Sequence, residues 1–197
     1  NDDIVAPAKG FGQHPHNDME IISIPLRGAL THRDTMGHAQ AIKTGDVQVM
    51  SAGTGLQHSE YNESSDEEVN FLQLWIFPER RGVEPRYDQK SFDPADRQNS
   101  WQEIVRPHNV EGEGLWIHQN AFMHLADLQE GQSLDYTVKS EGNGVYFFIL
   151  EGDIIIGGNE LNKRDGIGVW NTSSVELTAK SNTEILAIEV PMDLPQF

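Results

Sequence analysis

Cysteine is absent from the sequence. Its absence excludes disulfide bridges, metal sites built on thiolates and catalysis by a cysteine nucleophile. Any metal site in this chain must therefore use histidine and carboxylate side chains. A chain without cysteine also suits a reducing compartment, and we expect a cytoplasmic protein.

Basic residues are scarce, since 14 Lys and Arg stand against 31 Asp and Glu, for a formal net charge of −17 at pH 7. Binding to nucleic-acid phosphates or to an anionic membrane surface depends on Lys and Arg. We therefore expect no nucleic-acid partner and no membrane partner. The acidic excess is interpreted mainly as an aid to solubility.

Long hydrophobic runs are also lacking. No run reaches the roughly 18 apolar residues that a transmembrane helix needs, and no signal-peptide pattern is visible. The chain begins with Asn1 and not with Met. We expect it to be a shortened or processed form of a longer protein.

Short β-prone segments separated by turns fill most of the chain. Residues 47–50 alternate between apolar and polar side chains, and residues 69–77 form the longest β-prone run of the first half. Helical periodicity is almost missing. The pattern predicts an all-β sandwich or barrel, whose interior is a natural place for side chains to converge.

A weak internal repeat predicts two copies of one β fold. Residues 150–153 resemble residues 26–29, and residues 164–170 resemble residues 43–49. Between the copies, Asp93 and Pro94 predict the start of a short helix. We expect a first barrel over residues 1–92, a linker with a short helix over residues 93–114, and a second barrel over residues 115–197.

Two pairs of candidate metal ligands stand about forty residues apart. His14 and His16 form a His-x-His pair, and His58 and Glu60 form a His-x-Glu pair. Side chains two residues apart on a β-strand point to the same face. Two strands that meet can therefore present three imidazoles and a carboxylate to one divalent metal, with Fe, Mn, Co, Ni, Cu and Zn all compatible.

Glu20 is an alternative to Glu60, because its parity along the chain matches that of His14 and His16. It could bind the metal itself or orient a ligand from the second shell. The spacing of the residues alone does not decide between these two roles. His32 and His38 are interpreted as structural or exposed residues, and Trp75 as a packing residue. The second half has no His-x-His pair, so we expect its barrel to be metal-free.

Both ligand pairs lie within motifs that resemble those of the cupin superfamily. The first motif is Gly10-x3-His14-x-His16-x3-Glu20-x7-Gly28, and the second is Gly45-x5-Ser51-Ala52-Gly53-x4-His58-x3-Asn62. Within cupins, residues 14–20, 45–55 and 58–61 are similar to the pirin family. The resemblance covers residues 1–92 well. The later half resembles the C-terminal barrel of the family only in a few short segments at strands and turns. The resemblance implies a bicupin, with two barrels of double-stranded β-helix type.

The pirin resemblance implies that His14, His16, His58 and Glu60 bind one divalent metal and that Glu20 belongs to the second shell. Iron is the first expectation for this metal, with Mn, Co, Ni, Cu or Zn as alternatives. Pirin chains carry further residues before the site. The family pattern therefore implies that upstream N-terminal strands are missing from this first barrel.

Several bacterial pirin-like proteins resemble quercetin 2,3-dioxygenases, which implies a small aromatic substrate and O2. The implied reaction opens the flavonol ring and releases CO, with Glu60 as the candidate base. One alternative is a metal-binding regulatory module of pirin type that docks on a protein partner. Another is a cupin enzyme that acts on a different small enol-like substrate.

Overall fold

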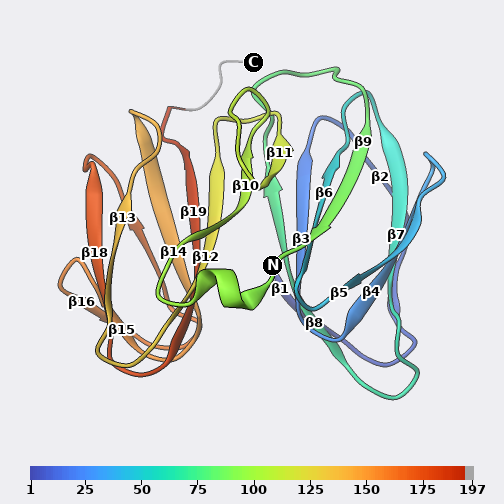
Figure 1. The fold of residues 1–197 in the computed structure, drawn as a ribbon. Helices are drawn as coiled ribbons and strands as arrows, with labels where there is room; N and C mark the ends of the chain where they lie inside the picture. The colour runs from blue at the N-terminus through green and yellow to red at the C-terminus, as the bar shows by residue number, and fades with distance from the viewer. Residues whose placement is uncertain (194–197) are drawn as a thin grey trace. The chain divides into compact units, whose positions relative to one another are not determined.

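The structure is a computed structural model that describes residues 1–193. Strands dominate this part of the chain, which contains a single short 3-10 helix, η1 (Pro94–Arg97). In the same residues no helix is long and apolar enough to span a membrane. The chain divides into two compact units, and each is built from two facing sheets (Figure 1). The prediction of an all-β chain with two barrels is confirmed.

The first unit comprises residues 1–92 and 115–119. One of its sheets has the strand order β1-β8-β3-β6-β9, and the other has the order β2-β7-β4-β5. The strands are β1 (Asp2–Val5), β2 (Gly10–His16), β3 (Glu20–Arg27), β4 (Ala29–Asp34), β5 (Ala39–Lys43), β6 (Asp46–Ser51), β7 (Leu56–Asn62), β8 (Val69–Ile76) and β9 (Arg86–Ser91). The short strand β11 (Leu115–Ile117) packs near β6 and β9.

Strand β7 shows how the interior of the first unit is built. Leu56, His58, Glu60 and Asn62 are buried, and the residues between them are more exposed. Leu56 belongs to an apolar cluster, and Leu30, which pairs with Asn62, belongs to a second apolar cluster. His58 and Glu60 therefore lie on the inner face between two apolar regions, where solvent competes little with a metal or a hydrogen bond.

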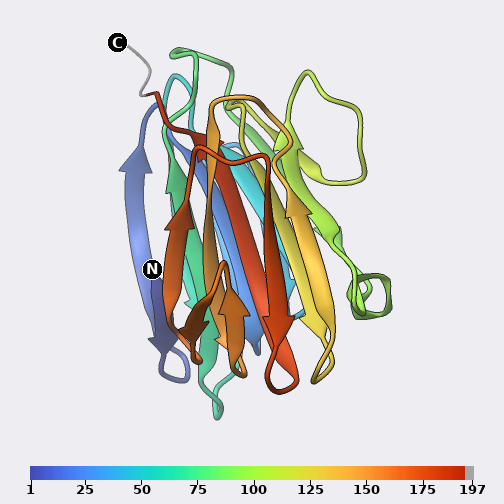
Figure 2. The same cartoon turned by 90° about the vertical axis from the view of Figure 1, so that its left-hand side faces the viewer.

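The second unit comprises residues 93–114 and the chain from residue 120 onward. Its sheets contain the strand orders β10-β12-β19-β14-β17 and β13-β18-β15-β16, and Figure 2 shows these strands in yellow-green to red. They are β10 (Gln102–Pro107), β12 (Phe122–Leu128), β13 (Ser133–Thr137), β14 (Asn143–Glu151), β15 (Ile154–Ile156), β16 (Asn159–Leu161), β17 (Gly166–Val169), β18 (Ser174–Ala179) and β19 (Thr183–Pro191).

Residues 93–114, predicted as a linker, contain η1 and the paired strand β10. Asp93 caps η1, since its side chain accepts a hydrogen bond from the backbone N–H of Ala95 at 2.9 Å. Residues 115–119 belong with the first unit. Pairing between strands that are far apart in the sequence decides which unit each segment joins, and local composition does not reveal this pairing.

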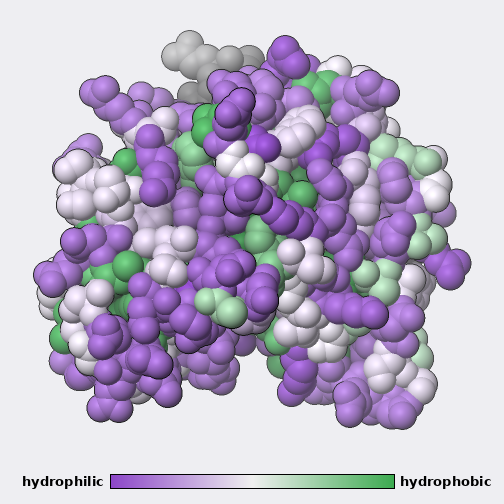
Figure 3. All heavy atoms as spheres, viewed as in Figure 1, coloured by the Kyte–Doolittle hydropathy of each residue, from purple (hydrophilic) through white to green (hydrophobic). Residues whose placement is uncertain are grey.

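Apolar side chains form a large part of the interior of the second unit. Tyr136, Phe147, Ile149, Ile154 and Ile185 belong to one large buried cluster. Hydrophilic residues cover most of the molecular face in Figure 3, in keeping with the net charge of −17.

Candidate metal centre

The pairing of β2 with β7 brings the two predicted ligand pairs together. His14 lies opposite His58 in this antiparallel pair, and His16 lies opposite Leu56. Directly opposite residues point to the same face of a sheet. A bulge between Phe11 and His14 shifts the register and sets which residue of β2 faces His58.

His14, His16 and His58 form a three-histidine set. One nitrogen from each ring lies within 4.8 Å of a nitrogen of the other two. The ring centroids are 4.4 Å apart for His14 and His58, and 4.9 Å apart for each of the other two pairs. Three imidazoles at this separation can bind one first-row divalent metal.

Glu60 belongs to a second set, which it shares with His58 and His32. The ligand atoms of these three fully buried side chains also lie within 4.8 Å of one another. His32 lies opposite Glu60 in the β4–β7 pair. His58 is therefore common to both sets, and the structure places the four predicted ligands in two overlapping groups. Their joint coordination of one metal stays a prediction.

Several nitrogens in this region have no hydrogen-bond partner among residues 1–193. They are Nε2 of His16, Nδ1 of His32 and both ring nitrogens of His58, all buried. A buried polar atom without a partner costs about 1–3 kcal/mol. The donor set of imidazole nitrogens and a carboxylate therefore fits a divalent transition metal, whose binding would satisfy these atoms.

His14 and Glu60 are already held by neighbours. Nδ1 of His14 lies 2.8 Å from the carbonyl oxygen of Gly12 and can donate to it, which leaves Nε2 for a metal. The two carboxylate oxygens of Glu60 accept hydrogen bonds from Ser23 at 3.3 Å and from Gln73 at 2.7 Å. These contacts orient both side chains before any ligand binds.

Burial sets the protonation of the centre. It lowers the pKa of His58 to about 3, with a further contribution from the neighbouring His14, His32 and His16 rings. Burial also lowers the pKa of His16 and His32 and raises the pKa of Glu60. His58 is thus neutral at physiological pH, as a metal ligand must be, and Glu60 holds a proton more readily than an exposed glutamate.

Glu20 does not share a face with His14 and His16, contrary to the expectation from parity. Strand β2 ends at His16, Asp18 has a positive φ of 46°, and Glu20 begins β3 in the other sheet. Its carboxylate accepts a hydrogen bond from Ser51 at 2.7 Å. Ser23, three residues further along β3, reaches Glu60, so Glu20 points to the opposite side of that sheet.

Two residues of the site were not identified from the sequence. His32 is 0% exposed and belongs to a ligand set, and its alternation with Asp34 on β4 was the available signal. Trp75 is 54% exposed and does not belong to the core. Its ring packs edge-on against His16, with centroids 4.9 Å apart, and its Nε1 donates to Gln73.

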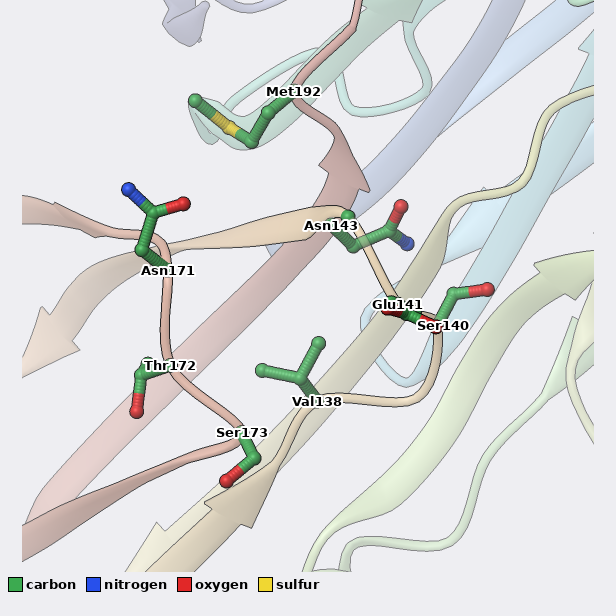
Figure 4. A pocket seen from close by; sticks show the side chains of 9 residues that line it. Val138, Ser140, Glu141, Asn143, Asn171, Thr172, Ser173 and Met192 are labelled. Carbon is green, nitrogen blue, oxygen red and sulfur yellow. The ribbon is translucent and has the colours of Figure 1, made fainter.

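A pocket of about 470 Å³ lies in the second unit (Figure 4). Small polar side chains such as Ser140, Asn143 and Thr172 line it together with Val138 and Met192. Both ligand sets found among the described residues lie in the first unit. This pocket is therefore separate from the candidate metal centre.

Comparisons with known proteins agree with the arrangement of two barrels. The chain is similar to a family described as Pirin over residues 1–76 and to one described as the quercetinase C-terminal cupin domain over residues 104–190. It is 35% identical over 191 residues to a protein from Escherichia coli named quercetin 2,3-dioxygenase. That similarity covers 97% of this chain and 80% of the relative.

Solved structures give the same result. The crystal structure of YhhW from Escherichia coli has a TM-score of 0.91 and 34% identity, covering 100% of this chain and 81% of that one. A crystal structure of bacterial pirin YhhW in complex with nickel(II) has a TM-score of 0.88 and 33% identity, covering 96% of this chain and 80% of that one. The fold is thus a bicupin, and the chain belongs to the pirin family.

Proposed function

We propose that this chain is a metal-dependent quercetin 2,3-dioxygenase, which opens the flavonol ring with O2 and releases CO. The convergence of three imidazoles, of which that of His58 is fully buried, beside the buried carboxylate of Glu60 carries this proposal. The name of the Escherichia coli relative supports the substrate and the reaction. The cytoplasmic location stays a prediction, and a protein partner belongs to the alternative interpretation as a metal-binding regulatory module.

His14, His16, His58 and Glu60 would hold one divalent metal. Iron is our first choice, and the same donors accept Mn, Co, Ni, Cu or Zn. Nickel(II) is bound in one crystal structure of the bacterial pirin YhhW. When bound, the metal supplies Lewis-acid activation of the flavonol hydroxyl and a meeting point for O2.

Glu60 is suited to take the proton of the flavonol hydroxyl. It is buried beside the imidazoles, where burial raises its pKa, and a carboxylate within reach of the substrate hydroxyl can act as a general base. Ser23 and Gln73 keep its two oxygens in place while the proton is held. Deprotonation makes the substrate electron-rich, which favours its reaction with O2.

Trp75 is suited to contact the aromatic rings of the substrate. It is exposed, packs against His16, and connects through Gln73 to Glu60. An aromatic side chain at the edge of a polar centre can stack on a flat ligand and position it for reaction.

The test is turnover of quercetin by purified protein that has been stripped with a chelator and reloaded with each divalent metal in turn. Under air we expect loss of the quercetin absorbance together with release of CO. The matching flavone without the 3-hydroxyl is the control, and it should not react. Absence of turnover with every metal, at full occupancy, would overturn the proposal.

A further inference from the structure

The predicted ligand set provides no hydrogen-bond acceptor for the second ring nitrogen of His58. A histidine that binds a metal through one ring nitrogen carries a proton on the other, and that N–H is almost always given to an acceptor. His14 has the carbonyl oxygen of Gly12 for this purpose. Neither ring nitrogen of His58 has a partner within residues 1–193.

Nδ1 of His32 is a free acceptor beside His58. The ring of His32 is 0% exposed and lies 5.3 Å from that of His58, centroid to centroid. It also packs against Tyr87 at 4.8 Å, which limits its movement. Nδ1 of His32 is buried and has no partner in the described part of the chain.

Asp34 determines which nitrogen of His32 accepts. Nε2 of His32 lies 3.2 Å from Oδ2 of Asp34. An ionised carboxylate only accepts hydrogen bonds, so Nε2 carries the proton and Nδ1 keeps its lone pair. Asp34 is itself fixed, because its Oδ1 accepts from the backbone N–H groups of Met36 at 2.9 Å and His38 at 3.0 Å.

We propose that His32 and Asp34 form an orienting pair for His58 in the metal-loaded protein. His58 donates its second ring N–H to Nδ1 of His32, and His32 donates its Nε2–H to Asp34. His32 is thus a positioning residue that acts through His58. This arrangement satisfies the buried nitrogens of both rings and sets the orientation of the imidazole that the two ligand sets share. The inference rests on the proposed metal centre and not on the flavonol reaction.

The closing experiment measures zinc affinity by chelator competition. Asp34→Asn keeps the shape of the side chain, and its amide oxygen keeps the backbone contacts. Its NH2 group then faces His32 and donates to Nε2, which moves the ring proton to Nδ1 and removes the acceptor for His58. His32→Phe removes the acceptor and keeps a ring against Tyr87. We expect both variants to bind zinc about 10–100-fold more weakly.

His38→Gln is the matched control. His38 also contacts Asp34, through Nδ1 at 2.9 Å, but its side chain is 36% exposed and it lies outside both ligand sets. Its zinc affinity should equal that of the parent. Thermal melting of the metal-free variants reports whether each one folds.

Nitrogen NMR of the zinc-loaded parent provides a readout that needs no variant. We expect His32 to carry its proton on Nε2 and to accept at Nδ1. A proton on Nδ1 of His32, or folded variants with parental zinc affinity, would overturn the orienting pair alone. A parent that binds no zinc would overturn the metal centre as well, so the two failures are distinguishable.

Discussion

His58 lies directly opposite His14 in the β2–β7 pair, and their imidazole centroids are 4.4 Å apart. The same His58 ring provides a ligand atom to the set that contains His32 and Glu60. Removal of His58 therefore affects both sets, whereas removal of any other member affects one.

We expect His58→Gln to reduce the metal content of the purified protein to background and to abolish quercetin turnover. Metal analysis and the absorbance assay check this result. His108→Gln, an exposed histidine of the second unit, is the control and should keep both properties. Parental metal content in His58→Gln would show that the metal binds elsewhere.

Glu60→Gln and Glu20→Gln separate the two candidate carboxylates. We expect Glu60→Gln to lower quercetin turnover by about 100-fold or more, since an amide cannot accept the substrate proton. Glu20→Gln should keep parental turnover and metal content, because Glu20 bonds Ser51 and lies outside both ligand sets. The opposite pattern would make Glu20 the functional carboxylate.

Glu20 should make stability depend on pH. Burial raises its pKa from 4.5 to about 7. The folded state then binds the proton more tightly than the unfolded chain, so the stability linked to this group is present at low pH and is lost as pH rises from about 4.5 to 7. The loss amounts to at most about 3 kcal/mol.

Urea unfolding of the parent and of Glu20→Gln at pH 5 and pH 8 measures this effect. The variant should lose less stability than the parent between the two pH values, because glutamine does not titrate. An equal loss in both proteins would show that Glu20 titrates normally in the folded state.

Trp75→Ala should raise the KM for quercetin about tenfold, through loss of an aromatic contact worth roughly 1.4 kcal/mol. Trp75→Phe should recover most of this loss, because a ring remains beside His16. Steady-state kinetics check both, with metal content measured in parallel. An unchanged KM in Trp75→Ala would exclude substrate contact at this residue.

Tyr136→Phe tests whether the second unit contributes only stability. The hydroxyl of Tyr136 donates to Glu189 at 2.9 Å and lies 3.2 Å from Nδ1 of His124, with all three side chains buried. Its loss should lower the free energy of unfolding by about 1–3 kcal/mol. Metal content and turnover of the folded variant should not change. A loss of bound metal would link this buried network to the centre.

The strand pattern and the ligand types could be predicted from the sequence. A period of two between His14 and His16, and between His58 and Glu60, places each pair on one face because each lies within a single strand. The same local rule failed for Glu20, since β2 ends at His16 and the backbone turns at Asp18 before Glu20 begins the next strand. Residues two positions apart share a face only as far as the strand continues.

Tertiary structure decided how these groups combine. The partnership of His14 with His58, and of His32 with Glu60, depends on the register between strands that are far apart in the sequence. Register is set by packing of the whole sheet and by a bulge. The sequence by itself therefore determined which side chains could bind a metal, and long-range pairing decided that His58 is shared, that His32 joins it and that Trp75 is exposed.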